Sequence, residues 1–129
     1  MANILAGMER HGVRRLIVLG AGGARGAKRA LRDQGALSRA FSGLLVDTLL
    51  KNPMAAQRAQ YALIEGSSAD YTIVQPPRLT NRPATGSYRV QEAAFPPQMK
   101  ATPRADVADF MLRQLKDQIW VRKSPFLCI

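Results

Sequence analysis

The sequence predicts an α/β fold in which helices cover a parallel β-sheet. Two short runs rich in leucine and β-branched residues, at residues 15–19 and 71–75, have the composition of buried parallel strands. Apolar residues spaced three and four apart precede each run and indicate helices. Because helices and strands alternate along the 129 residues, we expect one domain with a parallel sheet between helices.

The N-terminal part is expected to form a helix and a strand. Apolar residues at positions 4, 5 and 8 predict a short amphipathic helix that ends at Gly12. Residues 15–19 form an apolar run bounded by charge and glycine, which predicts a strand buried on both faces. The glycine-rich residues 20–26 are expected to follow as a loop.

The middle of the chain is expected to be largely helical. A turn or two of helix fits residues 27–34, and a longer helix capped by Ser38 follows with an apolar face. The Asn52-Pro53 pair should break or kink this helix, since the residue before a proline is pushed away from helical angles. A further helix is then expected from Pro53 to about Glu65.

The C-terminal part is expected to hold more strands and one more helix. Residues 71–75 form a strand that stops at two prolines, and residues 87–90 predict a short edge or hairpin strand. Thr102 as cap and Pro103 at the first helical position predict a helix start, and the tail at 119–129 should add an extended segment. The core face of this last helix is expected to carry Val107, Phe110, Met111 and Leu115.

Composition narrows the class of protein. Apolar residues make up 47% and charged residues 22% of the chain, as in a soluble globular domain. No run is long enough to cross a bilayer, and the N-terminus lacks the basic region of a secretory signal. Cys128 is the only cysteine and His11 the only histidine, so an internal disulfide is excluded and no metal site is predicted. These features favour a cytoplasmic protein that does not bind membranes.

The net charge of +10 favours partners that carry phosphate. Eight of the cationic residues fall between positions 10 and 39, where Asp33 is the only acid. Aromatic residues are not interleaved with them, and no zinc-finger, zipper or RNA-binding signature is present. A solvated basic surface is therefore favoured over a nucleic-acid-binding protein, whose affinity would fall steeply with salt.

The loop after the first strand is a candidate phosphate-binding site. Its glycines lie three residues apart, a spacing that lets the backbone approach a phosphate at a helix N-terminus. The segment that follows, however, is short and basic, and Asp47 falls within an expected helix rather than at a strand end. A mobile loop over the edge of the site is the alternative that we favour. The candidate residues are Gly20, Ala21, Gly22, Gly23, Arg25 and Gly26.

The end of the strand at 71–75 is the second candidate region. Open α/β sheets bind ligands beyond the carboxyl ends of their strands, where Pro76, Pro77 and Arg78 follow. Proline has no N–H and shapes a rigid wall, while Arg78 can pair with an anionic group. A strand stop with a solvent-facing arginine is an equally good interpretation.

Four segments carry a resemblance to a known family: residues 3–19, DYTIVQPPRLT at 70–80, TGSY at 85–88 and RADVADFML at 104–112. They resemble the atypical short-chain dehydrogenases/reductases, the NAD(P)-binding NmrA-like and flavin/biliverdin-reductase-like proteins. The resemblance runs through the whole chain but covers only the second half of that family's domain, without its N-terminal nucleotide fingerprint. It implies a Rossmann-like three-layer fold, truncated to a half-domain, with the 20–26 loop and the 76–78 corner facing nicotinamide and substrate.

The chain departs from this family where relatives carry chemistry. Residues 20–22 lack the serine or threonine that relatives place near the nicotinamide, and no Tyr-x-x-x-Lys pair is present: Tyr61 has Glu65 four residues on. We therefore expect a binding or assembly module whose hydride chemistry is lost, with no catalytic residue assigned and NAD(P) left open as a ligand. The alternative is an NAD(P)H- or flavin-dependent oxidoreductase that uses the loop and the corner.

A half-domain also predicts a partner. Without the family's first half, one edge of the sheet would expose unpaired backbone groups and apolar side chains. We expect a homo-oligomer, most simply a two-fold dimer, that covers this edge.

Overall fold

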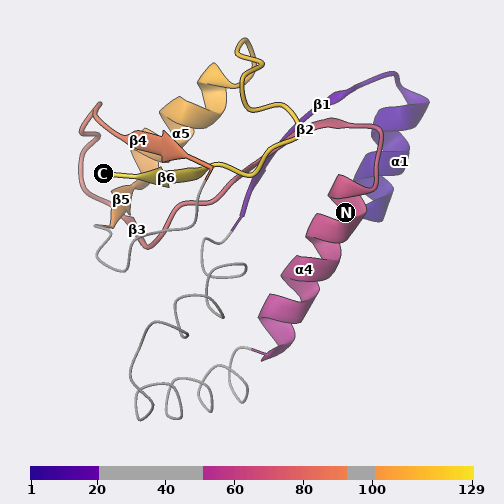
Figure 1. The fold of residues 1–129 in the computed structure, drawn as a ribbon, viewed down its shortest axis with the longest axis horizontal. Helices are drawn as coiled ribbons and strands as arrows, with labels where there is room; N and C mark the ends of the chain where they lie inside the picture. Colours follow the sequence, from indigo (N-terminus) through magenta and orange to yellow (C-terminus); the bar gives the residue numbers. More distant parts are fainter. Residues whose placement is uncertain (21–50, 93–100) are drawn as a thin grey trace.

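The computed structural model describes residues 1–20, 51–92 and 101–129, and the statements below concern those residues. The helices expected between residues 27 and 50 and the candidate residues Ala21, Gly22, Gly23, Arg25 and Gly26 lie outside them. The described elements are α1 (Ala2–Arg10), β1 (Arg15–Leu19), α4 (Lys51–Glu65), β2 (Asp70–Val74), β3 (Leu79–Thr80), β4 (Arg89–Gln91), β5 (Thr102–Pro103), α5 (Arg104–Arg113) and β6 (Phe126–Cys128), as drawn in Figure 1.

The parallel sheet predicted from the sequence is present. β1 and β2 pair in parallel from Arg15 opposite Asp70 to Leu19 opposite Val74. On the other side of β2, parallel bridges join it to the segment that leads into β6. β6 pairs antiparallel with β4, so β4 is a strand but not half of a local hairpin. A separate short parallel pair, β3 with β5, was not predicted.

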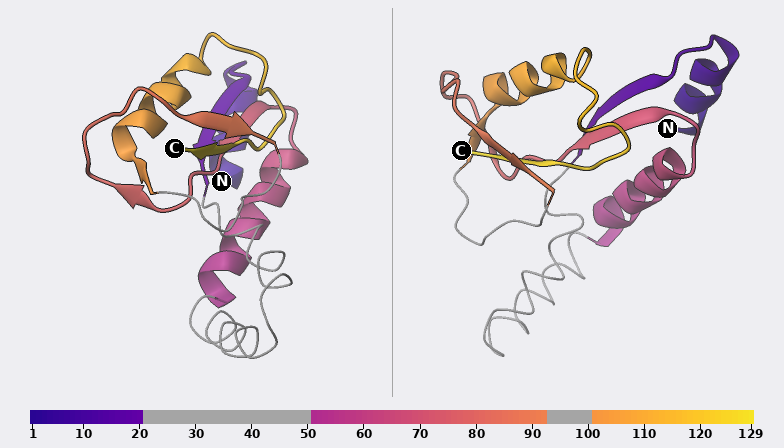
Figure 2. Two further views of the ribbon diagram at one scale, coloured as in Figure 1. Left: turned by 60° about the vertical axis from the view of Figure 1, so that its left-hand side comes forward. Right: turned by 45° about the horizontal axis from the view of Figure 1, so that its top comes forward.

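Two helices cover opposite faces of this sheet and give the three expected layers (Figure 2). On one face, Tyr61 and Ile64 of α4 pack against Tyr71 and Ile73 of β2. The core of the other face is built from residues of α5, β2 and β6, which are Val107, Phe110, Val74 and Leu127. The alternation of side chains along β2 therefore supplies both cores, as a strand between two helical layers requires.

The sequence predicted a break or a kink at Asn52-Pro53, and the break is wrong within the described residues. Lys51 and Asn52 already belong to α4, which continues through Pro53 to Glu65. The end of the helix was predicted correctly, because Gly66 follows and its N–H still donates to Ala62 O at 3.0 Å.

The expected start of the last helix is also wrong in detail. Pro103 is the N-cap of α5, with φ −58° and ψ 138°, and Thr102 belongs to β5. The N–H of Thr102 donates to Arg78 O at 2.8 Å, so strand pairing rather than capping fixes this residue. Of the predicted core face, Val107 and Phe110 are buried, but Leu115 lies beyond the helix end and is 63% exposed.

β1 is less buried than its sequence predicts. Its first four residues are half-buried and Leu19 is 47% exposed, whereas Tyr71 to Val74 of β2 are all buried. The difference follows from pairing: in the described part of the chain β2 has neighbours on both sides and β1 has only β2. The prediction of a strand buried on both faces is therefore not met in the described residues.

Within residues 1–20, 51–92 and 101–129, no helix has the length and apolar character needed to cross a bilayer. The same residues contain no group of three or more potential metal ligands.

Candidate functional site

The carboxyl ends of β1 and β2 bring the two predicted regions together. Gly20 follows β1 directly and donates its N–H to Val74 O at 2.7 Å. Because the strands are parallel and in register, Gly20 lies level with Gln75 and beside Pro76. The structure therefore places the first residue of the glycine loop next to the proline corner, at the edge where ligands of open α/β sheets bind.

Gly20 is buried, and the hydroxyl of Tyr61 occupies the space that a side chain at position 20 would need. A Cβ built at this position would collide with Tyr61 Oη and lie 3.0 Å from Ile73 Cγ2. Tyr61 and Ile73 are themselves buried, so neither has free space to move into. Packing of α4 against the strand end thus requires glycine here. The helical spacing of Tyr61 and Ile64 predicts that both face the sheet, but no sequence signal predicts the contact with Gly20.

The proline corner combines two rigid prolines with one exposed cation. Pro76 is buried, Pro77 is half-buried and Arg78 is exposed. The corner is anchored through the backbone, since Arg78 O accepts the Thr102 N–H of β5. No carboxylate of the described residues forms an ion pair with Arg78, so its guanidinium is available at the sheet edge. Both interpretations of this arginine, an anion partner and a solvent-facing cation, agree with this geometry.

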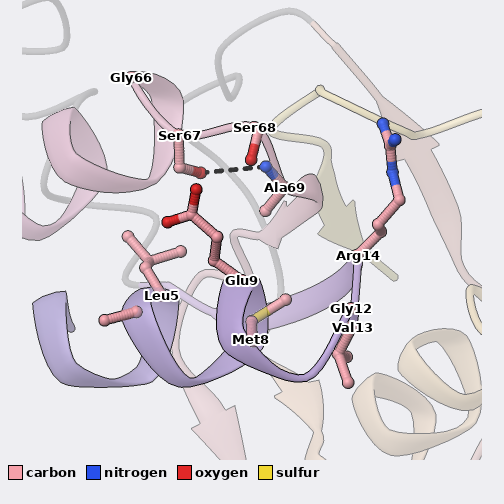
Figure 3. A pocket seen from close by; sticks show the side chains of 11 residues that line it. Leu5, Met8, Glu9, Gly12, Val13, Arg14, Gly66, Ser67, Ser68 and Ala69 are labelled. Atoms are coloured by element: carbon pink, nitrogen blue, oxygen red, sulfur yellow. Dashed lines mark hydrogen bonds between the residues drawn. The ribbon is translucent and has the colours of Figure 1, made fainter.

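A cleft of about 550 Å³ lies at the opposite, amino end of the strands (Figure 3). It separates α1 from the turn after α4, and Glu9 of α1 extends across it toward Ser67. Ser67 is engaged locally: its Oγ donates to Ile64 O at 2.6 Å and accepts the Ala69 N–H at 3.3 Å. No sequence pattern predicted this cleft, which lies away from both predicted regions.

The acids of α5 serve structure. The Asp106 carboxylate accepts the Thr85 hydroxyl at 2.7 Å and the N–H groups of Thr85 and Gly86 at 3.0 Å. These hydrogen bonds, chiefly that from the hydroxyl, lower the pKa of Asp106. The aspartate therefore ties the turn before β4 to the first turn of α5, where a negative charge also favours the helix dipole.

Tyr88 is held in a comparable way and is unsuited to proton transfer. Its hydroxyl donates to Asp109 Oδ2 at 2.7 Å, and Arg113 Nε donates to the same oxygen at 2.9 Å. Burial, followed by the hydrogen bond to Asp109, raises the pKa of Tyr88 to about 12. A phenol with this pKa stays protonated at neutral pH, far from the range that favours general acid–base catalysis.

Part of the basic N-terminal stretch is also structural. Arg15 donates from Nε and Nη2 to Gln114 O at 3.0 and 2.8 Å, and from Nη1 to Asp70 O at 2.6 Å. Its guanidinium thereby joins the start of β1 to the end of α5, and burial lowers its pKa. Arg14 forms an exposed ion pair with Asp70 at 3.2 Å. These contacts give Arg14 and Arg15 structural roles, whereas Arg25, Lys28, Arg29, Arg32 and Arg39 lie outside the described residues.

The fold and this edge identify the class. The family model for NAD(P)H-binding proteins matches residues 1–118, and the chain belongs to this family. A search of curated proteins found no match.

Solved structures agree on the fold. The chain is similar to a short-chain dehydrogenase/reductase of Veillonella parvula, at 21% identity and a TM-score of 0.71 over 98% of this chain and 55% of that one. It is also similar to an oxidoreductase of Lactococcus lactis, at 22% identity and a TM-score of 0.70 over 95% and 49%. An anaerobillin reductase of Escherichia coli O157:H7 matches at 18% identity and a TM-score of 0.61 over 96% and 54%. The chain thus spans about half the length of these proteins, and the likeness shows a Rossmann-like fold.

The family implies a nicotinamide nucleotide, and the described residues fit it in part. Arg78 provides an exposed cation at the carboxyl edge, which suits a phosphate or another anionic group. The space above Gly20 is filled by Tyr61, so this glycine is explained by packing and does not by itself form a cradle for the cofactor.

Proposed function

We propose that the chain is a binding and assembly module of the NAD(P)H-binding family that associates through the outer edge of β1. One observation carries the proposal: in the described residues β1 has a strand partner on one side only. Its hydrogen bonds alternate, since Arg14 O accepts from Asp70 and Gly20 N–H donates to Val74. In a parallel ladder the residues between them direct their backbone groups away from β2. The N–H and C=O of Ile17 and Leu19 therefore point to the outer edge.

The partner that we propose is a second copy of the chain. An unpaired strand edge readily adds another strand, and closed two-fold dimers are the commonest homo-oligomers. The side chains support this edge as a contact surface, because β1 is an apolar strand that is only half-buried and its last residue, Leu19, is 47% exposed. The proposal includes loss of hydride chemistry, which is supported by the missing Tyr-x-x-x-Lys pair.

The test is the mass of the chain in solution, measured by light scattering after size-exclusion chromatography. A dimer of 14.1 kDa subunits is expected for the natural sequence. Leu19→Lys places a charge at the strand edge and should give a monomer. Leu63→Lys is the matched control, since Leu63 of α4 is 49% exposed, and it should remain a dimer. A monomeric natural chain, or equal effects of the two substitutions, would contradict the proposal.

A second candidate function is nucleotide binding at the carboxyl edge. The observation that favours it is the meeting of Gly20, Pro76 and the exposed Arg78 at this edge, in a family that binds NAD(P)H. When bound, such a nucleotide supplies or accepts a hydride; in this chain Arg78 would pair with its anionic part and Pro76 would form a wall.

Thermal unfolding with NADPH, NADH, FMN and FAD tests this candidate. We expect saturable stabilisation by one nucleotide, reduced in Arg78→Ala and kept in Arg82→Ala, a nearby exposed arginine. Stabilisation by none of the four, or equal loss in both variants, would rule out the carboxyl edge as a nucleotide site and leave assembly as the function.

A further inference from the structure

The backbone of β1 determines how a second copy can pair with it. Every second residue directs its backbone groups toward β2, as Gly20 shows by donating its N–H to Val74 O at 2.7 Å. The residues between them, Arg15, Ile17 and Leu19, therefore present their N–H and C=O groups at the outer edge. In the described residues no other strand lies beside this edge.

A parallel pair of β1 strands cannot be two-fold symmetric. In a parallel pair a residue bonds to the neighbours of the residue opposite it, as Asp70 does: it lies opposite Arg15 but donates its N–H to Arg14 O at 2.7 Å. A two-fold axis along the strands would set Ile17 opposite the partner's Ile17. The groups that Ile17 then needs, those of the partner's residues 16 and 18, point toward the partner's own β2. A two-fold dimer must therefore pair its β1 strands antiparallel.

Ile17, at the centre of the strand, gives this antiparallel pair its register. With Ile17 opposite the partner's Ile17, Arg15 lies opposite the partner's Leu19. Each outward N–H and C=O of the strand then meets one of the partner. Moving the centre to Leu16 or to Val18 would set Leu19 or Arg15 opposite residues outside the strand, and their outward groups would lose these partners.

The side chains agree with this register on both faces of the strand. On one face Leu16 lies beside the partner's Val18, and both belong to residues that pack against the core covered by α4. On the other face Ile17 packs against the core that contains residues of α5, and here it meets the partner's Ile17. Each apolar core thus continues into that of the partner.

The charges at the ends of the strand are compatible with this pairing. Arg15 lies opposite the partner's Leu19, and its guanidinium is already bound to two backbone carbonyls, those of residues 70 and 114. Arg14 lies opposite the partner's Gly20, which has no side chain, and forms an ion pair with Asp70 at 3.2 Å. Like charges directly opposite one another, which destabilise a strand pair, are therefore avoided.

We propose that two copies form one continuous sheet by antiparallel pairing of their β1 strands, about a two-fold axis through the pair of Ile17 residues. The proposal rests on the proposed function, because it needs the β1 edge to be the dimer interface. Helix α4 of both copies then covers one face of the combined sheet, and α5 covers the other. The carboxyl ends of the two β1 strands point in opposite directions, so each copy keeps its own carboxyl edge with its own Arg78.

Cysteine cross-linking in a Cys128→Ala background tests this register, since Cys128 is the only natural cysteine. Leu16 and the partner's Val18 form a non-hydrogen-bonded pair with Cα atoms about 4.5 Å apart, a distance that a disulfide can bridge. Leu16 and the partner's Leu16 lie diagonally, about 7–8 Å apart, beyond the usual reach of a disulfide. The same diagonal distance separates the two Val18 residues.

Leu16→Cys and Val18→Cys are therefore each other's matched control. Treated with oxidised glutathione, neither variant should form a disulfide-linked dimer alone, whereas an equal mixture with exchanged subunits should form one. Cross-linking of Leu16→Cys or Val18→Cys with itself indicates a parallel or shifted pair and would overturn the proposal. A dimeric mixture without cross-links would overturn it as well.

Light scattering separates this result from the proposed function. A monomeric natural chain contradicts both proposals, whereas a dimer that fails the cross-linking test contradicts only the antiparallel register. Where a cysteine variant is monomeric and the natural chain is a dimer, NMR of a natural dimer of labelled and unlabelled copies decides. A contact between the α-protons of Leu16 and the partner's Val18 is expected, and its absence would overturn the register.

Discussion

Gly20→Ala is expected to destabilise the chain because the new methyl group has no space. Its Cβ would collide with Tyr61 Oη and lie 3.0 Å from Ile73 Cγ2. Both neighbours are buried, at 3% and 0% exposure, so the helix or the strand end must shift. Overpacking of this kind costs about 1–3 kcal/mol, and the lower entropy of the unfolded alanine chain offsets about 0.4–1 kcal/mol. A net loss of about 1–2 kcal/mol in the free energy of unfolding follows.

A double-mutant cycle with Tyr61→Phe identifies the cause. Phenylalanine lacks the hydroxyl that the methyl group meets, although the ring carbon Cζ remains, 3.1 Å from the added Cβ. Gly20→Ala should therefore cost less in the Tyr61→Phe background, with a coupling energy of about 0.5 kcal/mol or more. An interaction that Tyr61→Phe removes cancels from the cycle where Gly20→Ala leaves that interaction unchanged.

Urea unfolding followed by circular dichroism measures all four proteins, with the slope of each transition checked for constancy. Additive losses, or a Gly20→Ala variant as stable as the natural chain, would refute the packing explanation of Gly20. The residue would then have to be explained by its place at the start of the glycine loop.

Two further predictions concern the other layer of the fold. The pKa of Asp106 is lowered on folding, so the stability that it contributes is present above its ordinary pKa of 3.8 and is lost as the pH falls through the lower folded value. Asp106→Asn should therefore be less stable than the natural chain at neutral pH, and urea midpoints should converge in acid; a constant difference would contradict this. Leu127→Ala should cost about 2–5 kcal/mol because Leu127 is 0% exposed, while Leu115→Ala, at 63% exposure, should change stability by less than about 0.5 kcal/mol; similar urea midpoints would refute this account of the core.

The strongly patterned segments were predictable from the sequence. The strands at 15–19 and 71–75 and the helix after residue 103 follow from composition and spacing, and their order correctly predicted a parallel sheet between helices. These signals come from short segments of the sequence. In any layered fold the apolar face of a helix or strand must be buried against another element, so each segment predicts its own structure without knowledge of its partner.

The errors have a common cause, which is that partners distant in sequence decided the local structure. Threonine is a common N-cap residue, and for this reason Thr102 was expected to cap the helix. Its N–H instead donates to the distant carbonyl of Arg78, and this hydrogen bond places Thr102 in a strand. Val90 was expected in an edge or hairpin strand; within the described residues β4 pairs on one side only, and its partner is the distant strand β6. The apolar composition of β1 predicts a fully buried strand with a neighbouring strand on each side. In the described part of the chain β1 has one neighbouring strand, and it is only half-buried.

The sequence predicted where the candidate site lies, but not the side-chain contacts within it. Parallel strands put Gly20 and Pro76 at one edge, and this follows from the predicted order of elements. The contact between Gly20 and Tyr61 depends on side-chain packing, for which spacing along the chain carries no signal.

Amide hydrogen exchange in β1, measured by NMR over a range of protein concentrations, tests the central claim most directly. The strand contains its own control, because the N–H of Gly20 bonds to β2 and those of Ile17 and Leu19 point outward. Pairing with a second copy predicts that Ile17 and Leu19 are protected at high concentration and lose protection on dilution, while Gly20 stays protected throughout. Exchange of Ile17 and Leu19 that does not depend on concentration would show that no second copy covers this edge.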